Sequence, residues 1–249
     1  MKTLQTHQAL AACDTDRPCT LNTTQSLDRA LAVLASLCAV VVGLMVVGIV
    51  FTKSSQDFYQ SARSVQAFAE HLSTAPMVAE GLRINLGLDN LFMVLYAAFF
   101  VLLAARLRAL VGGRIVTVAL SAMLMTVFLD ALENHHITMM LHSLENGLPI
   151  SVGDGQFQMV ASQIKFHASY FSVVLFGLGF WRLGKLGRLT ALSLWCYVPL
   201  GVLISVTPVE SAKALVLGRT VFFVFAFVLS ACLFARSARR GSTAADAPQ

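Results

Sequence analysis

The stretch LAVLASLCAVVVGLMVVGIVFT, residues 31–52, contains no charged side chain. A helix of about 20 apolar residues is long enough to cross the hydrocarbon core of a bilayer. This stretch is longer than the apolar core of a signal peptide, and it begins well inside the chain. We therefore predict a transmembrane helix that is retained in the mature protein.

Similar apolar runs follow along the rest of the chain. They cover residues 86–105, 115–141, 159–181, 189–207 and 214–235. Because lipid offers no hydrogen-bond partner to an exposed backbone, each run must form a helix. The composition agrees, since only 12% of the residues are charged, whereas soluble domains carry about 25%. We predict an all-α, six-span transmembrane bundle over residues 29–240, with flexible tails at 1–28 and 241–249.

Basic residues are concentrated in three segments outside the predicted spans. These are Arg106, Arg108 and Arg114; Arg182, Lys185 and Arg188; and Arg236, Arg239 and Arg240. The positive-inside rule places such segments in the cytoplasm. Both tails are then cytoplasmic (N-in, C-in), and for a bacterial protein the compartment is the inner membrane. The net charge of +5 follows from this topology, so it gives no reason to expect nucleic-acid binding.

The longest connection, residues 53–85, lies on the outer side in this topology. Apolar residues recur within it at helical spacing: Phe58, Ala62, Val65, Phe68 and Leu72. This pattern predicts an amphipathic helix that lies on the membrane or covers the bundle. The alternative is that the segment extends the first span into water.

Ionisable and amide side chains interrupt four of the predicted spans. They are Asn85, Asp89 and Asn90 in the second; Asp130, Glu133, Asn134, His135 and His136 in the third; Lys165 and His167 in the fourth; and Arg219 in the sixth. The predicted topology places all of them at a similar depth near the outer face. Ionisable residues inside a membrane are costly, and they normally face the interior of a bundle and serve a function. We therefore expect one polar site built by four helices.

Helical periodicity indicates which side chains of the third span point inward. At about 100° per residue, Asp130, Glu133 and Asn134 share one arc of the helix. His136 borders this arc beside Glu133, whereas His135 points nearly opposite Asp130. We expect the first three residues to face the site, with His136 at its edge.

The same reasoning applies to the neighbouring spans. Asp89 and Tyr96 fall on one stripe of the second span, so both are expected to face the interior. In the fourth span, Lys165 and His167 lie about 200° apart and cannot both point into the site. Because lysine can extend along its stem toward water, His167 is the preferred site residue.

The candidate site is therefore rich in carboxylates. We predict catalytic roles for Asp89, Asp130, Glu133, Asn134 and His167, and binding roles for Lys165, Arg219 and Tyr96. Three carboxylates cannot all stay charged in a low-dielectric site unless something compensates them. A metal ion, a retained proton or ion pairs with the basic residues would provide that compensation.

A metal ion is the first of these alternatives. Glu133 and His136 form a Glu-x-x-His pair, a spacing that presents two ligands from one helix. With His167 they predict a zinc-type divalent metal site. A zinc-activated water would suit the hydrolysis of a lipid amide or ester that enters from the outer leaflet.

Two further alternatives need no metal. Carboxylates beside a histidine can transfer protons at neutral pH, either in a reaction or in proton-coupled transport. Ion pairs between helices would instead stabilise a sensor or an assembly subunit of another membrane protein. We favour chemistry on, or binding of, a lipophilic molecule, with membrane lipids as the surrounding partners; enzyme and binding protein both fit these residues.

Overall fold

The computed structural model describes residues 18–54, 60, 70–71, 76–207 and 211–245. Within these residues the chain forms six α-helices and no strand. The helices are α1 (Pro18–Thr52), α4 (Pro76–Val111), α5 (Gly113–Glu145), α6 (Val152–Trp181), α7 (Gly184–Val206) and α8 (Lys213–Ala245). Each is long and apolar enough to cross a membrane. The predicted all-α fold with six spans is confirmed, and the chain is a multi-pass membrane protein.

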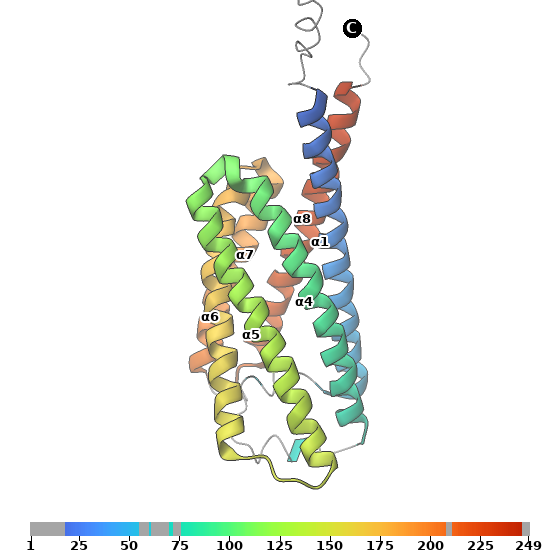
Figure 1. Ribbon diagram of the computed structural model, residues 1–249, viewed down its shortest axis with the longest axis vertical. Helices are drawn as coiled ribbons and strands as arrows, with labels where there is room; N and C mark the ends of the chain where they lie inside the picture. The colour runs from blue at the N-terminus through green and yellow to red at the C-terminus, as the bar shows by residue number, and fades with distance from the viewer. Residues whose placement is uncertain (1–17, 55–59, 61–69, 72–75, 208–210, 246–249) are drawn as a thin grey trace, which may run out of the picture.

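The six helices form a closed ring in chain order (Figure 1). Each helix packs against the next, and α8 returns to pack along α1. Short connections separate α4, α5, α6 and α7, so these neighbours run antiparallel. The start of α1 and the end of α8 lie side by side and extend beyond the other four helices (Figure 1). All helices therefore present one face to a common interior.

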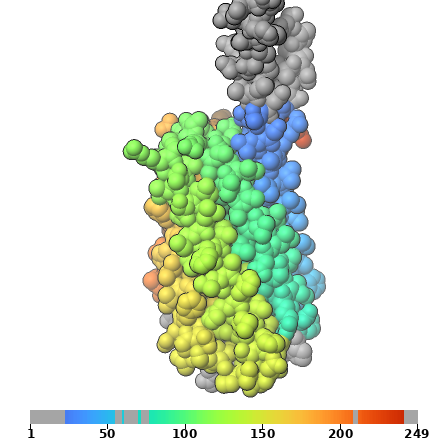
Figure 2. All heavy atoms as spheres, viewed as in Figure 1, coloured from blue at the N-terminus to red at the C-terminus, as the bar shows by residue number. Residues whose placement is uncertain are grey.

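The outside of the ring is mainly apolar, whereas buried polar and charged residues lie inside it. Large side chains such as Phe51, Phe128 and Leu217 are 74%, 64% and 65% exposed. On the face shown in Figure 2, side chains of α1, α4, α5 and α6 lie side by side along the molecule. Exposed apolar surface on this scale is unfavourable in water but suits a lipid environment.

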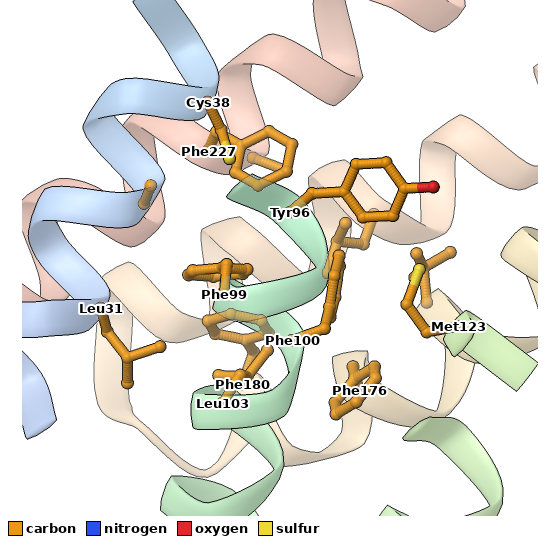
Figure 3. Close-up of a cluster of buried hydrophobic side chains, with 14 of the residues drawn as sticks. Leu31, Cys38, Tyr96, Phe99, Phe100, Leu103, Met123, Phe176, Phe180 and Phe227 are labelled. Carbon is orange, nitrogen blue, oxygen red and sulfur yellow. The ribbon is translucent and has the colours of Figure 1, made fainter. Parts of the chain in front are cut away.

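An aromatic core fills the half of the bundle in which α4 and α6 end. Phe99 and Phe100 of α4 pack there with Phe176 of α6 and Phe227 of α8 (Figure 3). Tyr96 lies at the edge of this cluster, and its hydroxyl group points away from it (Figure 3). A smaller apolar cluster joins α4 and α5 near the opposite end; it consists of Val78, Leu82, Leu86, Ile137, Met140 and Leu141. The polar residues predicted to form the site, among them Asp89 of α4 and Asp130 of α5, lie between these two clusters.

Some predicted boundaries differ from those of the structure. α1 begins at Pro18, so residues 18–28 are helical although we predicted a flexible tail there. α8 likewise continues to Ala245, beyond the predicted end of the bundle at residue 240. Packing against α8 supports the extension of α1, since Gln25 Nε2 donates a 2.9 Å hydrogen bond to the Ala238 carbonyl. The predicted amphipathic helix falls mostly outside the described residues, and so do residues 1–17 and 246–249 of the tails.

Candidate functional site

Lys165 of α6 lies between two carboxylates of α5. Its Nζ atom is 2.8 Å from Asp130 Oδ1 and 2.7 Å from Glu133 Oε1. Because the two acids are three residues apart, they share one face of α5, and this face turns toward α6. All three side chains are buried. Buried charges are tolerated only when they are paired, so these contacts explain how the three groups coexist inside an apolar bundle.

Glu133 is the most enclosed of these groups, with an exposed fraction of 1%. Besides Lys165, it accepts a 2.7 Å hydrogen bond from Gln60 Nε2 and a hydrogen bond from the Ser162 hydroxyl. Gln60 comes from the segment between α1 and α4, and Ser162 comes from α6. Glu133 thus accepts from three donors at once, which fixes its carboxylate and, through it, the position of the Lys165 ammonium group.

Asp130 and Asp89 are held by side chains of other helices. The Tyr96 hydroxyl of α4 donates a 2.8 Å hydrogen bond to Asp130 Oδ2. Asn134 Nδ2 of α5 donates to Asp89 Oδ2 at 2.8 Å and to Asn90 Oδ1 at 3.1 Å. These contacts join α4 to α5 at the level where Lys165 joins α5 to α6. The polar groups form one layer across three helices.

A cavity of about 190 Å³ opens beside this layer, inside the ring. Its polar end is formed by Asp89, Asp130, Lys165 and Arg219. Its walls are mainly apolar and aromatic: Val42, Met45, Ile49, Phe92, Tyr96, Phe100, Phe166, Tyr197 and Phe223. Glu133 does not line it, because it lies behind Lys165. Binding sites for small molecules commonly combine apolar walls with a few fixed polar groups, as this cavity does.

Arg219 of α8 brings a second cation to the cavity. Its guanidinium carbon lies 4.3 Å from the centre of the Phe166 ring, and Lys165 Nζ lies 4.8 Å from the same centre. At such distances the face of an aromatic ring attracts a cation. Phe166 therefore keeps two positive groups near the polar end of the cavity.

The predicted inward-facing residues are buried, with one important exception. Asp89, Tyr96, Asp130, Glu133, Asn134, Lys165 and Arg219 are all buried. His167 is exposed, and its Nδ1 atom lies 2.7 Å from the Gln163 carbonyl oxygen of its own helix. The preference for His167 over Lys165 was therefore wrong. The two residues do lie on different faces of α6, but the lysine face is the buried one because two carboxylates of α5 pair with it.

His135 and His136 of α5 lie outside the layer or at its edge. His136 Nδ1 is 2.9 Å from Gln158 Oε1, and its Nε2 is 3.8 Å from Asp154 Oδ1. His136 is half-buried. Its contacts are with residues at the start of α6 and not with Glu133. His135 is exposed, as its helical position predicts.

The predicted metal ligands Glu133, His136 and His167 are not brought together. In the described part of the chain, no group of three or more His, Cys, Asp or Glu side chains is arranged to hold a metal ion. The Lys165 ammonium group lies where a cation between the α5 carboxylates would be. The zinc-type site stays a prediction without a ligand set among the described residues.

Two of the groups that complete the site were not predicted from the sequence. Gln60 reaches Glu133 from the segment 53–85, for which we predicted an amphipathic helix on the membrane or over the bundle, or an extension of the first span, but no site residue. Ser162 lies on the same face of α6 as Lys165, and serines on that face are a weak signal of a polar interior. No local pattern distinguishes Gln60 from its neighbours.

Comparison of the chain with protein-family models, with curated proteins and with solved structures found no significant match. The site must therefore be interpreted from its own geometry and charges.

Proposed function

We propose that this membrane protein binds a lipophilic molecule in the central cavity. The polar group of that molecule would lie at the end formed by Asp89, Asp130, Lys165 and Arg219, and its apolar part would lie against the aromatic walls. The observation that carries the proposal is this combination of an apolar, aromatic cavity with a charged end. An inner membrane location and entry from the outer leaflet follow from the positive-inside rule and are part of the proposal.

The charges at the polar end suggest which polar group the ligand carries. Among the described residues, the layer and the cavity beside it hold three carboxylates, Asp89, Asp130 and Glu133, against two cations, Lys165 and Arg219. Lys165 pairs with two of the acids, whereas Asp89 accepts its hydrogen bond from a neutral amide. A ligand with a positive charge or with strong hydrogen-bond donors would compensate the remaining acid. We therefore propose a lipophilic amine or a comparable donor.

Acid–base chemistry on the bound molecule is a second candidate, which one observation supports. Asp130 lines the cavity and accepts hydrogen bonds from both Tyr96 and Lys165. A proton could pass between these three groups and a molecule in the cavity. In this version the protein would be an enzyme, and Asp130 would be the group that exchanges the proton with the substrate.

A third explanation assigns the charged layer to stability alone. Lys165 joins α5 to α6, and the layer would then fix the packing of a sensor or assembly subunit. This explanation predicts a cavity that holds nothing specific, so ligand occupancy separates it from the proposal.

The test is the content of the cavity in purified protein. Protein is isolated in detergent, extracted with organic solvent, and analysed by mass spectrometry for molecules present in stoichiometric amount. Thr220→Phe on α8 fills the cavity, since Thr220 lines it. Leu217→Phe adds an aromatic ring on the exposed face of the same helix and is the matched control. Asp89→Asn keeps the shape of the site and removes one negative charge.

We expect one compound in extracts of the wild type and of Leu217→Phe, and its loss from Thr220→Phe and Asp89→Asn. Unfolding temperatures measured in the same detergent confirm that the variants are folded. Identical extracts from all four proteins, or a compound lost equally from Leu217→Phe, would show that the cavity binds no specific molecule.

A further inference from the structure

A second cavity, of about 390 Å³, lies at the end of the bundle where α1 begins and α8 ends. Four basic side chains line it: Arg106 of α4, Lys185 of α7, and Arg236 and Arg240 of α8. No described residue that lines it is acidic. A concave surface with four cations attracts anions strongly, because its walls concentrate the field.

Among the described residues, Asp28 of α1 is the one buried acid in contact with residues of this cavity. It pairs with Arg106, whose Nε atom lies 2.7 Å from Asp28 Oδ1, and it accepts a 2.6 Å hydrogen bond from the Ser237 hydroxyl. Asp28 is 2% exposed, so its charge is used to orient Arg106 and does not face the cavity. The cavity keeps a clear positive excess even when this pair is counted as neutral.

The remaining walls suit a ligand that is charged at one end and apolar at the other. Leu183, Leu186, Leu233 and Phe234 give the cavity apolar surface. The first turn of α7, Gly184–Leu186, forms another part of the wall. The first N–H groups of a helix have no acceptor within the helix, so this turn adds partial positive charge to that of the four cations.

The position of the cavity along the helices corresponds to the surface of a membrane. The only two tryptophans of the chain, Trp181 and Trp195, stack on each other with ring centres 5.4 Å apart. Trp181 ends α6, and Leu183, two residues later, lines the cavity. Tryptophans of membrane proteins gather at the level of the lipid head groups. The four cations therefore lie at the depth where lipid phosphates are found.

We propose that this cavity binds a phosphate group, as carried by an anionic phospholipid of the adjacent leaflet. The basic side chains and the first turn of α7 would hold the phosphate, and the leucines and Phe234 would contact the glycerol and the first part of the acyl chains. Basic pockets between transmembrane helices are known to recognise anionic head groups in this way. The site is separate from the central cavity, and it does not depend on what the central cavity binds.

The test compares two double variants of the full-length protein that lose the same charge from the same two helices. Lys185→Gln with Arg236→Gln removes two cations of the cavity. Arg188→Gln with Arg239→Gln removes two exposed cations that do not line it. Delipidated protein in detergent is titrated with phosphatidylglycerol and, separately, with phosphatidylcholine, and bound lipid is counted by native mass spectrometry.

Each basic side chain near an anionic head group is expected to contribute roughly fivefold in affinity. The cavity variant should therefore bind phosphatidylglycerol about 25-fold more weakly than the wild type, whereas the control variant should stay close to the wild type. Phosphatidylcholine should bind more weakly than phosphatidylglycerol to the wild type. Equal losses in the two variants would indicate general attraction to a basic surface and would overturn the proposal, as would no loss in either.

A second arm identifies the source of the phosphate. Lipid-free wild type is heated in inorganic phosphate and in chloride at equal ionic strength. Stabilisation by phosphatidylglycerol but not by inorganic phosphate supports a lipid ligand, whereas stabilisation by inorganic phosphate that is lost in the cavity variant supports a free phosphate compound. If the cavity variant does not fold, Leu233→Trp tests the same site by filling it without changing a charge; unchanged phosphatidylglycerol binding in that variant would contradict the proposal.

Discussion

The ammonium group of Lys165 lies 2.7 Å from Glu133, a carboxylate that is only 1% exposed. Each group stabilises the charge of the other, because an unpaired charge is costly inside this apolar bundle. Because Glu133 also accepts from Gln60 and Ser162, the pair connects α5 to α6 and to the segment that follows α1. The pair therefore positions Lys165 at the cavity and also stabilises the fold.

The first prediction concerns variants that remove the charges of Lys165 and Glu133 one after the other. Lys165→Met leaves two carboxylates without their cation and should lower the free energy of unfolding by about 3 kcal/mol. Adding Glu133→Gln removes one of the uncompensated charges, so the double variant should be more stable than Lys165→Met alone. Unfolding in a titration with dodecyl sulfate measures both effects. Ile164→Met, at an exposed neighbouring position, is the control and should change little; a double variant no more stable than Lys165→Met would show that the pair does not couple α5 to α6.

The second prediction concerns the close contact between α6 and α7. A Cβ atom added at Gly187 would meet the carbonyl oxygen of Phe180 and would lie 2.8 Å from Leu183 Cβ. A backbone oxygen at the end of a helix cannot rotate away as a side chain can, so Gly187→Ala should lower the free energy of unfolding by about 2 kcal/mol. Gly43→Ala meets nothing within 4 Å and should be neutral or slightly stabilising. Equal unfolding curves for the two alanine variants would mean that α7 does not approach α6 this closely.

The third prediction concerns pH and the segment between α1 and α4. Burial lowers the pKa of the His71 imidazole below its ordinary value of 6.5. The folded protein therefore resists protonation of this group more than the unfolded chain does, so the contribution of His71 to stability falls as the pH drops below about 6.5. Between pH 7 and 5, the unfolding temperature of His71→Gln should fall less steeply than that of the wild type. His142→Gln, at an exposed position, is the comparison; a slope in His71→Gln as steep as that of the wild type would contradict the assignment.

The sequence predicts the six spans well because lipid imposes a strong and local requirement on each of them. Every stretch that crosses the membrane must be helical and contain about 20 mainly apolar residues, whichever segments pack against it. Helical periodicity was equally useful within one helix, and it placed Asp130, Glu133 and Asn134 of α5 on the buried face. Both inferences depend only on residues that are close in the chain.

The contacts between helices could not be predicted in this way. For Lys165 and His167, periodicity shows that they lie on different faces but not which face is buried. That choice was decided by the two acids of α5, since pairing outweighs the tendency of lysine to extend toward water. The hydrogen bond between Gln60 and Glu133 joins residues 73 positions apart in the chain, and such a contact is a property of the whole fold.

The last prediction tests the topology on which the sidedness of both cavities depends. The basic segments predict that the C-terminus is cytoplasmic and that the α5–α6 connection, residues 146–151, is outside. In a bacterial host, green fluorescent protein fused after Gln249 should fluoresce, and alkaline phosphatase fused there should be inactive. Alkaline phosphatase fused after Gly147 should be active. The opposite pattern would show that the topology is inverted. The polar end of the central cavity would then face the cytoplasm, and the basic cavity would contact lipids of the outer leaflet.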